Sequence, residues 1–174
     1  NIFVDSLTAT RDAVTYLVGR GYGRIAMLGN TPGPGEARQQ GYRQALQTAG
    51  LPVRDEFVIR CDFTETGGYL GMQALLALPT RPDAVFAAND VMAMGALAAI
   101  QAAGLQVPAD IAVMGFDDIP LARLLTPSLT TVRQYQTQLG RRAAELLLER
   151  LTGAYTGPGR SQEMPYEIVP RTSA

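Results

Sequence analysis

The chain has 174 residues, 47% of them hydrophobic, and a formal net charge of −1, which suits one folded domain and argues against disorder, a basic nucleic-acid-binding surface and a membrane-spanning segment. His and Lys are both absent, which removes the commonest general base, a Schiff-base nucleophile and the lysine of a phosphate-binding P-loop. The single cysteine, Cys61, excludes an internal disulfide, and it suits a core position in a protein of the reducing cytoplasm.

Five short apolar runs predict the strands of a buried sheet. They are residues 2–4, 25–28, 57–61, 84–87 and 111–114. Each run is mostly continuous in apolar character rather than alternating, which is typical of parallel strands covered on both faces.

Helical patterns separate these strands. Apolar residues recur at helical spacing over 8–20, 36–49, 64–78 and 89–103. Thr8, Thr64 and either Asn89 or Asp90 are the predicted N-caps. Successive strands lie roughly 25–35 residues apart, the length of a right-handed βαβ unit. We therefore expect an α/β fold, with a parallel sheet and helices on both faces.

The alternation of strands and helices ends after residue 114. An extended segment is predicted at 128–132 and a helix at 136–151, followed by a linker rich in Gly, Thr and Pro at 152–159. The last predicted strand, 166–169, lies between two prolines and is therefore expected at an edge.

Polar and aromatic residues follow four predicted strands, at the ends where ligands bind in open parallel sheets. The four candidates are Arg38, Phe63, Asn89 and Asp117. A carboxylate and an amide can hold neighbouring hydroxyls, a guanidinium adds planar donors, and a ring can cover the apolar side of a sugar or stack on a base. No nucleophile is paired with a base, so we expect binding of a neutral polyol without catalysis.

Each candidate also has a structural interpretation. Asn89 could cap a helix, Arg38 could be a surface cation, and Phe63 could pack in the core. Asp117 and its neighbour Asp118 could simply form a turn before Pro120.

Three further patterns are weak. The segment Gly-Pro-Gly-Glu-Ala-Arg at 33–38 begins like a dinucleotide fingerprint but lacks the last glycine and places proline in the tight turn. Asp117 and Asp118 have no third metal ligand nearby in the sequence, and Arg141 with Arg142 is too small a basic cluster for DNA. We therefore expect neither a cofactor nor a metal.

Three longer motifs resemble the LacI/GalR (lac-repressor) family of transcription regulators. They are Asp-Ala-Val-Phe-Ala-Ala-Asn-Asp at 83–90 with Met-Ala-Met-Gly-Ala at 92–96, Val-Pro at 107–108 with Ile-Ala-Val-Met-Gly-Phe-Asp-Asp at 111–118, and Thr-Pro-Ser-Leu-Thr-Thr-Val-Arg-Gln at 126–134. The resemblance covers nearly the whole chain. It implies a cytoplasmic repressor whose two-lobed core, of the type I periplasmic-binding-protein shape, holds a small effector, such as a sugar, between its lobes.

The resemblance also implies a division of the chain. Residues 6–133 and 160–172 would form the C-terminal lobe, and residues 1–5 and 134–159 would belong to the N-terminal lobe. The family's helix-turn-helix is absent from this sequence, so we expect contact with operator DNA only through a missing N-terminal domain, and no contact with a membrane.

Specific residues match positions that bind effectors in the family. Arg38 matches its effector-binding arginine, Phe63 a ring-stacking aromatic, Asn89 a sugar-binding amide, and Asp117 a hydroxyl-binding aspartate. Gln134 matches a further ligand contact. The resemblance therefore assigns all five to ligand binding.

Two apolar clusters suggest a homodimer. The helix expected after Asn89 is apolar nearly all round, and its surplus apolar face could meet another helix of the chain or a partner subunit. In the family this helix and the leucines at 121–125 lie at the two-fold interface. The resemblance thus implies an isologous dimer through Met94, Leu97, Leu121 and Leu125.

Two other functional classes stay open on sequence alone. A periplasmic sugar-binding protein of a transporter would share the fold and the site. An enzyme with a nucleotide-binding α/β domain would need a phosphate loop or a catalytic pair, and the sequence offers no support for either.

Overall fold

The computed structural model describes residues 1–29 and 34–174. The strand-end loop residues Asn30 and Thr31, and Gly33 of the fingerprint-like segment, lie outside the described residues.

The central sheet contains four parallel strands in the order β3-β2-β4-β5. They are β2 (Ile25–Leu28), β3 (Val58–Ile59), β4 (Ala84–Ala87) and β5 (Ala112–Met114). Every residue of β2, β4 and β5 is buried, which explains their continuous apolar sequences. Leu28 pairs with Ala87 and Phe86 pairs with Met114, so the carboxyl ends of these three strands share one edge.

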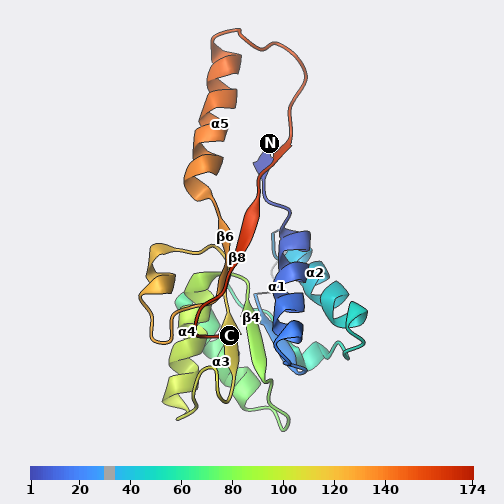
Figure 1. Ribbon diagram of the computed structural model, residues 1–174, viewed down its shortest axis with the longest axis vertical. Coiled ribbons are helices and arrows are strands. Elements are labelled where there is room, and N and C mark those ends of the chain that lie inside the picture. The colour runs from blue at the N-terminus through green and yellow to red at the C-terminus, as the bar shows by residue number, and fades with distance from the viewer. Residues whose placement is uncertain (30–33) are drawn as a thin grey trace.

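Two helices cover each face of this sheet (Figure 1). Helices α1 (Ser6–Gly19) and α2 (Pro34–Thr48) lie on one face, and α3 (Glu65–Leu76) and α4 (Asp90–Ala102) lie on the other. Along β2, Met27 joins the core beneath α1 and α2, whereas Leu28 joins the core beneath α3 and α4. The predicted α/β fold with helices on both faces is confirmed.

An antiparallel ribbon leads away from the central sheet. Its strands are β6 (Thr131–Gln134) and β8 (Tyr166–Val169), and a bridge between Asp117 and Arg133 ties it to the segment after β5. Beyond the ribbon, α5 (Gln136–Leu151) and the strand pair β1 (Ile2–Phe3) and β7 (Gln162–Glu163) project from the main body (Figure 1). Two short 3-10 turns, η1 (Asp55–Phe57) and η2 (Pro120–Arg123), complete the described elements.

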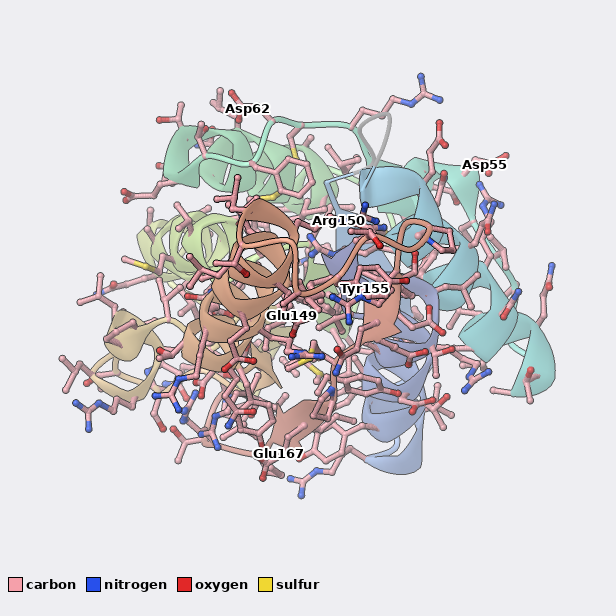
Figure 2. The ribbon with its side chains drawn as sticks, turned by 90° about the horizontal axis from the view of Figure 1, so that it is seen from above. Asp55, Asp62, Glu149, Arg150, Tyr155 and Glu167 are labelled. Carbon is pink, nitrogen blue, oxygen red and sulfur yellow. The ribbon has the colours of Figure 1, made fainter. Side chains whose placement is uncertain are left out.

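Helix α5 has no buried residue. Its leucines Leu147, Leu148 and Leu151 are 59%, 58% and 73% exposed. The linker after it folds back onto the helix, so that the ring of Tyr155 in the linker lies against Arg150 of the helix (Figure 2). The Cζ of Arg150 is 5.2 Å and the Cζ of Arg160 is 3.8 Å from the centre of this ring. None of the described helices combines the length and apolarity needed to cross a lipid bilayer.

Several local predictions are confirmed. Strands 25–28, 84–87 and 166–169 and helix 136–151 are confirmed at their predicted bounds. Thr64 and Asn89 are the N-caps of α3 and α4, accepting from the backbone N–H of Gly67 and Met92.

One predicted cap is wrong, and two predicted extended segments differ in their bounds. Asp5 rather than Thr8 caps α1, because its carboxylate accepts the backbone N–H of Leu7 and of Thr8 at 3.1 Å each. The strand expected at 57–61 shortens to β3, since residues 55–57 form the turn η1. The extended segment expected at 128–132 becomes a strand at 131–134, where β8 supplies the antiparallel partner.

Candidate functional site

Arg38 lies in α2 and is only 8% exposed. Its Nη1 donates to the carbonyl of Ala88 at 2.6 Å, and its Cζ lies 4.1 Å from the centre of the Phe116 ring. Burial lowers the pKa of Arg38, and the charge of Asp117 opposes that effect. The interpretation of Arg38 as a surface cation is therefore wrong. Its Nε is buried and has no hydrogen-bond partner among the described residues.

Phe116 follows β5 and lies directly against Arg38. It is fully buried, and its ring meets that of Phe86 edge-on, with 6.4 Å between centres and an angle of 88° between planes. Sequence reasoning missed this role, because a phenylalanine after a core strand carries no signal that separates it from ordinary packing.

Phe63 also lies near Arg38, and Asn89 contacts Phe63. The half-buried Phe63 ring is centred 6.0 Å from the Cζ of Arg38 and also packs against the core beneath α3 and α4. Asn89 caps α4 by accepting the N–H of Met92 at 2.7 Å, and its Nδ2 donates to the carbonyl of Phe63 at 3.1 Å. One amide N–H and one oxygen lone pair of Asn89 stay available for a ligand.

Asp117 follows Phe116 and contacts Gln134. The Nε2 of Gln134 donates to Oδ1 of Asp117 at 2.6 Å. Burial raises the pKa of Asp117, while the charge of Arg38 and the hydrogen bond from Gln134 act in the opposite direction. Arg38, Asp117 and Gln134 therefore form one electrostatically coupled group.

Asp118 has different partners from its neighbour. Its Oδ2 lies 2.6 Å from the Nε of Arg133, and its Oδ1 lies 2.6 Å from the Nη2 of Arg171. Burial alone would raise the pKa of Asp118, but the hydrogen bonds and charges of Arg171 and Arg133 hold it below its ordinary value. The carboxylate of Asp118 is thus committed to two ion pairs.

Asp90 is a buried residue that the sequence presents as a possible helix cap. Its oxygens accept hydrogen bonds from the Thr131 hydroxyl at 2.5 Å and the Ile119 N–H at 2.8 Å. Burial raises the pKa of Asp90 to about 6. This side chain joins α4, the turn before η2 and β6 directly beside the candidate site.

The five predicted ligand residues form one group at the carboxyl edge of the sheet. Arg38 lies near the Phe63 ring and interacts with the charge of Asp117, Gln134 donates to Asp117, and Asn89 donates to the Phe63 carbonyl. The group offers a guanidinium, a carboxylate, two amides and an aromatic ring, which suits a polyhydroxylated molecule. Its role in ligand binding stays a prediction.

The residues predicted for a dimer interface lie on a different surface. Met94, Leu97 and Leu125 line a groove of about 480 Å³ between α4 and the loop that contains Pro127. Leu121 lies in η2 and is 49% exposed. The four residues are thus accessible or half-buried, and their pairing with a second chain stays a prediction.

Similarity to known proteins covers nearly the whole chain. The family described as periplasmic binding protein-like domain matches residues 14–174. The HTH-type transcriptional repressor CytR of Escherichia coli strain K12 is 42% identical over 177 residues, covering 99% of this chain and 51% of CytR. The ribose operon repressor of the same strain is 44% identical over 164 residues, covering 93% of this chain and 49% of the repressor.

A solved structure has the same fold. The complex of the transcriptional regulator CelR with cellobiose superposes with a TM-score of 0.94 at 36% identity, covering 99% of this chain and 53% of the CelR chain. The chain spans about half the length of the curated relatives it matches.

Proposed function

Because this chain belongs to the periplasmic binding protein-like domain family, among the LacI-type regulators, we propose that it is the effector-binding part of a transcription repressor. Its effector is a small polyhydroxylated molecule, most simply a sugar, which it binds without transforming. The observation that carries this proposal is the coupled group of Arg38, Asp117 and Gln134 at the sheet edge, with Arg38 buried over Phe116 and its Nε unpartnered among the described residues.

The same proposal divides the chain between two lobes. Residues 6–133 and 160–172 form one lobe, and residues 1–5 and 134–159 belong to a second lobe that the rest of the full-length protein completes. The exposed leucines of α5 support this division, because an apolar stripe of this kind needs a cover. The effector then lies between the lobes.

The proposed dimer uses Met94, Leu97, Leu121 and Leu125 in an isologous interface. Part of the apolar surface of α4 is covered within the chain, because Ala93, Ala96 and other residues of the helix are buried in the core that it shares with α3. The groove lined by Met94 and Leu97 is the apolar surface of α4 that we propose a second copy of the chain covers.

Regulation follows from the two-lobe arrangement. An effector that binds two lobe arrangements with different affinities shifts the equilibrium between them. The size of that shift is limited by the difference in affinity. In the full-length protein the shift reaches a DNA-binding domain outside this chain, which supplies the contact with operator DNA in the cytoplasm. A transport protein would share the fold, but the curated relatives are repressors, which favours the regulatory function.

Calorimetry tests the ligand site. The full-length protein is titrated with a panel of sugars that includes D-ribose and cellobiose, and with purines. We expect a sugar to bind, and Asp117→Ala to weaken that binding by about 1–3 kcal/mol, because charge-assisted hydrogen bonds to hydroxyls are lost.

The matched control removes an exposed carboxylate far from the group. Asp55 pairs with Arg43 and its side chain is 88% exposed, so Asp55→Ala should leave the affinity unchanged. Failure of every sugar to bind, or equal affinity of Asp117→Ala and the unchanged protein, would contradict the proposal.

A further inference from the structure

Asp117 and Asp118 are consecutive residues that both have positive φ angles, 120° and 55°. This backbone region is uncommon and unfavourable for residues with a Cβ, although aspartate tolerates it better than most. Such a turn persists only where surrounding contacts hold it. The structure around the two aspartates must therefore contain a restraint.

Asp118 supplies that restraint. Its carboxylate bonds the Nε of Arg133 in β6 at 2.6 Å and the Nη2 of Arg171, just after β8, at 2.6 Å. Its side chain is 9% exposed, and Arg171 is anchored further by donating to the carbonyl of Leu129 at 2.7 Å. One largely buried carboxylate thus ties the turn to β6 and to the segment just after β8.

Asp117 is tied to the same strand through both its backbone and its side chain. Its backbone N–H donates to the carbonyl of Val132 at 2.8 Å, and Gln134 donates to its side chain at 2.6 Å. Because Arg133 and Gln134 are neighbours on β6, a shift of this strand against the turn would disturb both aspartates at once. The ion pairs of Asp118 resist such a shift.

From this geometry we infer that Asp118 is a positioning residue of the effector site. By clamping Arg133 and Arg171, it holds the Asp117 carboxylate and the Gln134 amide in the orientation that meets the effector. The effect on affinity rests on the proposed function, whereas the effect on the geometry of Asp117 requires no ligand.

A crystal structure of the full-length Asp118→Asn variant tests the geometric part. An amide keeps the shape of the side chain but cannot accept two arginines as an anion does. We expect φ of Asp117 to leave the left-handed region and the bond of 2.6 Å from Gln134 to be lost. Unchanged geometry at Asp117 and Gln134 overturns the inference, whether or not any sugar binds.

A double-mutant cycle with D-ribose tests the effect on affinity. If Asp118 acts through Asp117, Asp118→Asn weakens binding by about tenfold in the unchanged protein and by less than about twofold in an Asp117→Asn background. Equal losses in both backgrounds would indicate a general structural effect and overturn the inference. Absence of D-ribose binding by the unchanged protein counts against this choice of effector, and the crystal structure then decides the inference alone.

Two more variants complete the design. Arg133→Gln leaves the bond between Arg171 and Asp118 in place, so it replaces Asp118→Asn in both measurements if that variant does not fold. Glu149→Gln is the matched control, because Glu149 on α5 also lies between two arginines, Arg142 and Arg160. A loss of Asp117 geometry in this control would overturn the assignment to Asp118.

Discussion

Burial of the Asp90 carboxylate makes the stability of the fold depend on pH. Asp90 is fully buried and bonded to Thr131 and Ile119, and burial raises its pKa from 3.8 to about 6. The folded state therefore binds this proton more tightly than the unfolded state. The stability that Asp90 contributes is fully present below pH 3.8 and is lost as the pH rises through about 6.

We expect Asp90→Asn to remove that loss. The amide stays neutral, and it can accept the Ile119 N–H while donating to the Thr131 hydroxyl. Relative to the unchanged protein, the variant should gain free energy of unfolding between about pH 4 and about pH 7, measured by urea denaturation at each pH. Parallel pH profiles for the two proteins would contradict this assignment to Asp90.

Helices α3 and α4 approach each other closely because each carries a glycine at the contact. A Cβ at Gly68 would overlap the carbonyl oxygen of Met92, and a Cβ at Gly95 would overlap the carbonyl oxygen of Glu65. The neighbouring atoms are backbone, so they cannot move aside as a flexible side chain could. Small residues at this contact thus set the distance between the two helices that cover one face of the sheet.

Gly95→Ala should therefore destabilise the fold by about 2 kcal/mol or more, since overpacking here forces the helices apart. The control is Gly140→Ala in the interior of α5, where a Cβ would meet nothing within 4 Å. There, alanine should stabilise the helix by about 0.5–1 kcal/mol through its higher helix propensity. Thermal and urea unfolding of both variants measure the contrast, and equal effects would refute the packing argument.

At the scale of the whole molecule, the described residues include two exposed apolar surfaces that the proposal uses. One is the exposed leucine stripe of α5, which we propose is buried within the second lobe. The other includes Leu121 and Leu124, 49% and 68% exposed, beside the groove at Met94 and Leu97. Exposed apolar surface of this kind marks an interaction site.

For the proposed dimer of the full-length protein, we expect Met94→Asp to give monomers, because burying a charge in an apolar interface is strongly unfavourable. Light scattering of the full-length protein measures the mass. Leu70→Asp is the control, since Leu70 on α3 is 58% exposed but lies outside the proposed interface, and it should leave the dimer intact. A dimer that survives Met94→Asp would exclude this surface.

Much of the fold followed from local patterns in the sequence. The apolar runs of β2 and β4, the N-caps Thr64 and Asn89 and the amphipathic pattern of α5 act within a few residues, so one sequence was enough to predict them. The gathering of Arg38 and Asp117 was also predictable, because parallel strands bring their carboxyl ends to one edge.

The tertiary structure alone decided how the site is supported. No local pattern shows that Asp118 is clamped by Arg133 and Arg171, and the bond from Thr131 to Asp90 joins residues 41 positions apart. These contacts depend on where β6 and β8 return beside the sheet. That return is set by long-range pairing and packing, which no local pattern of residues encodes.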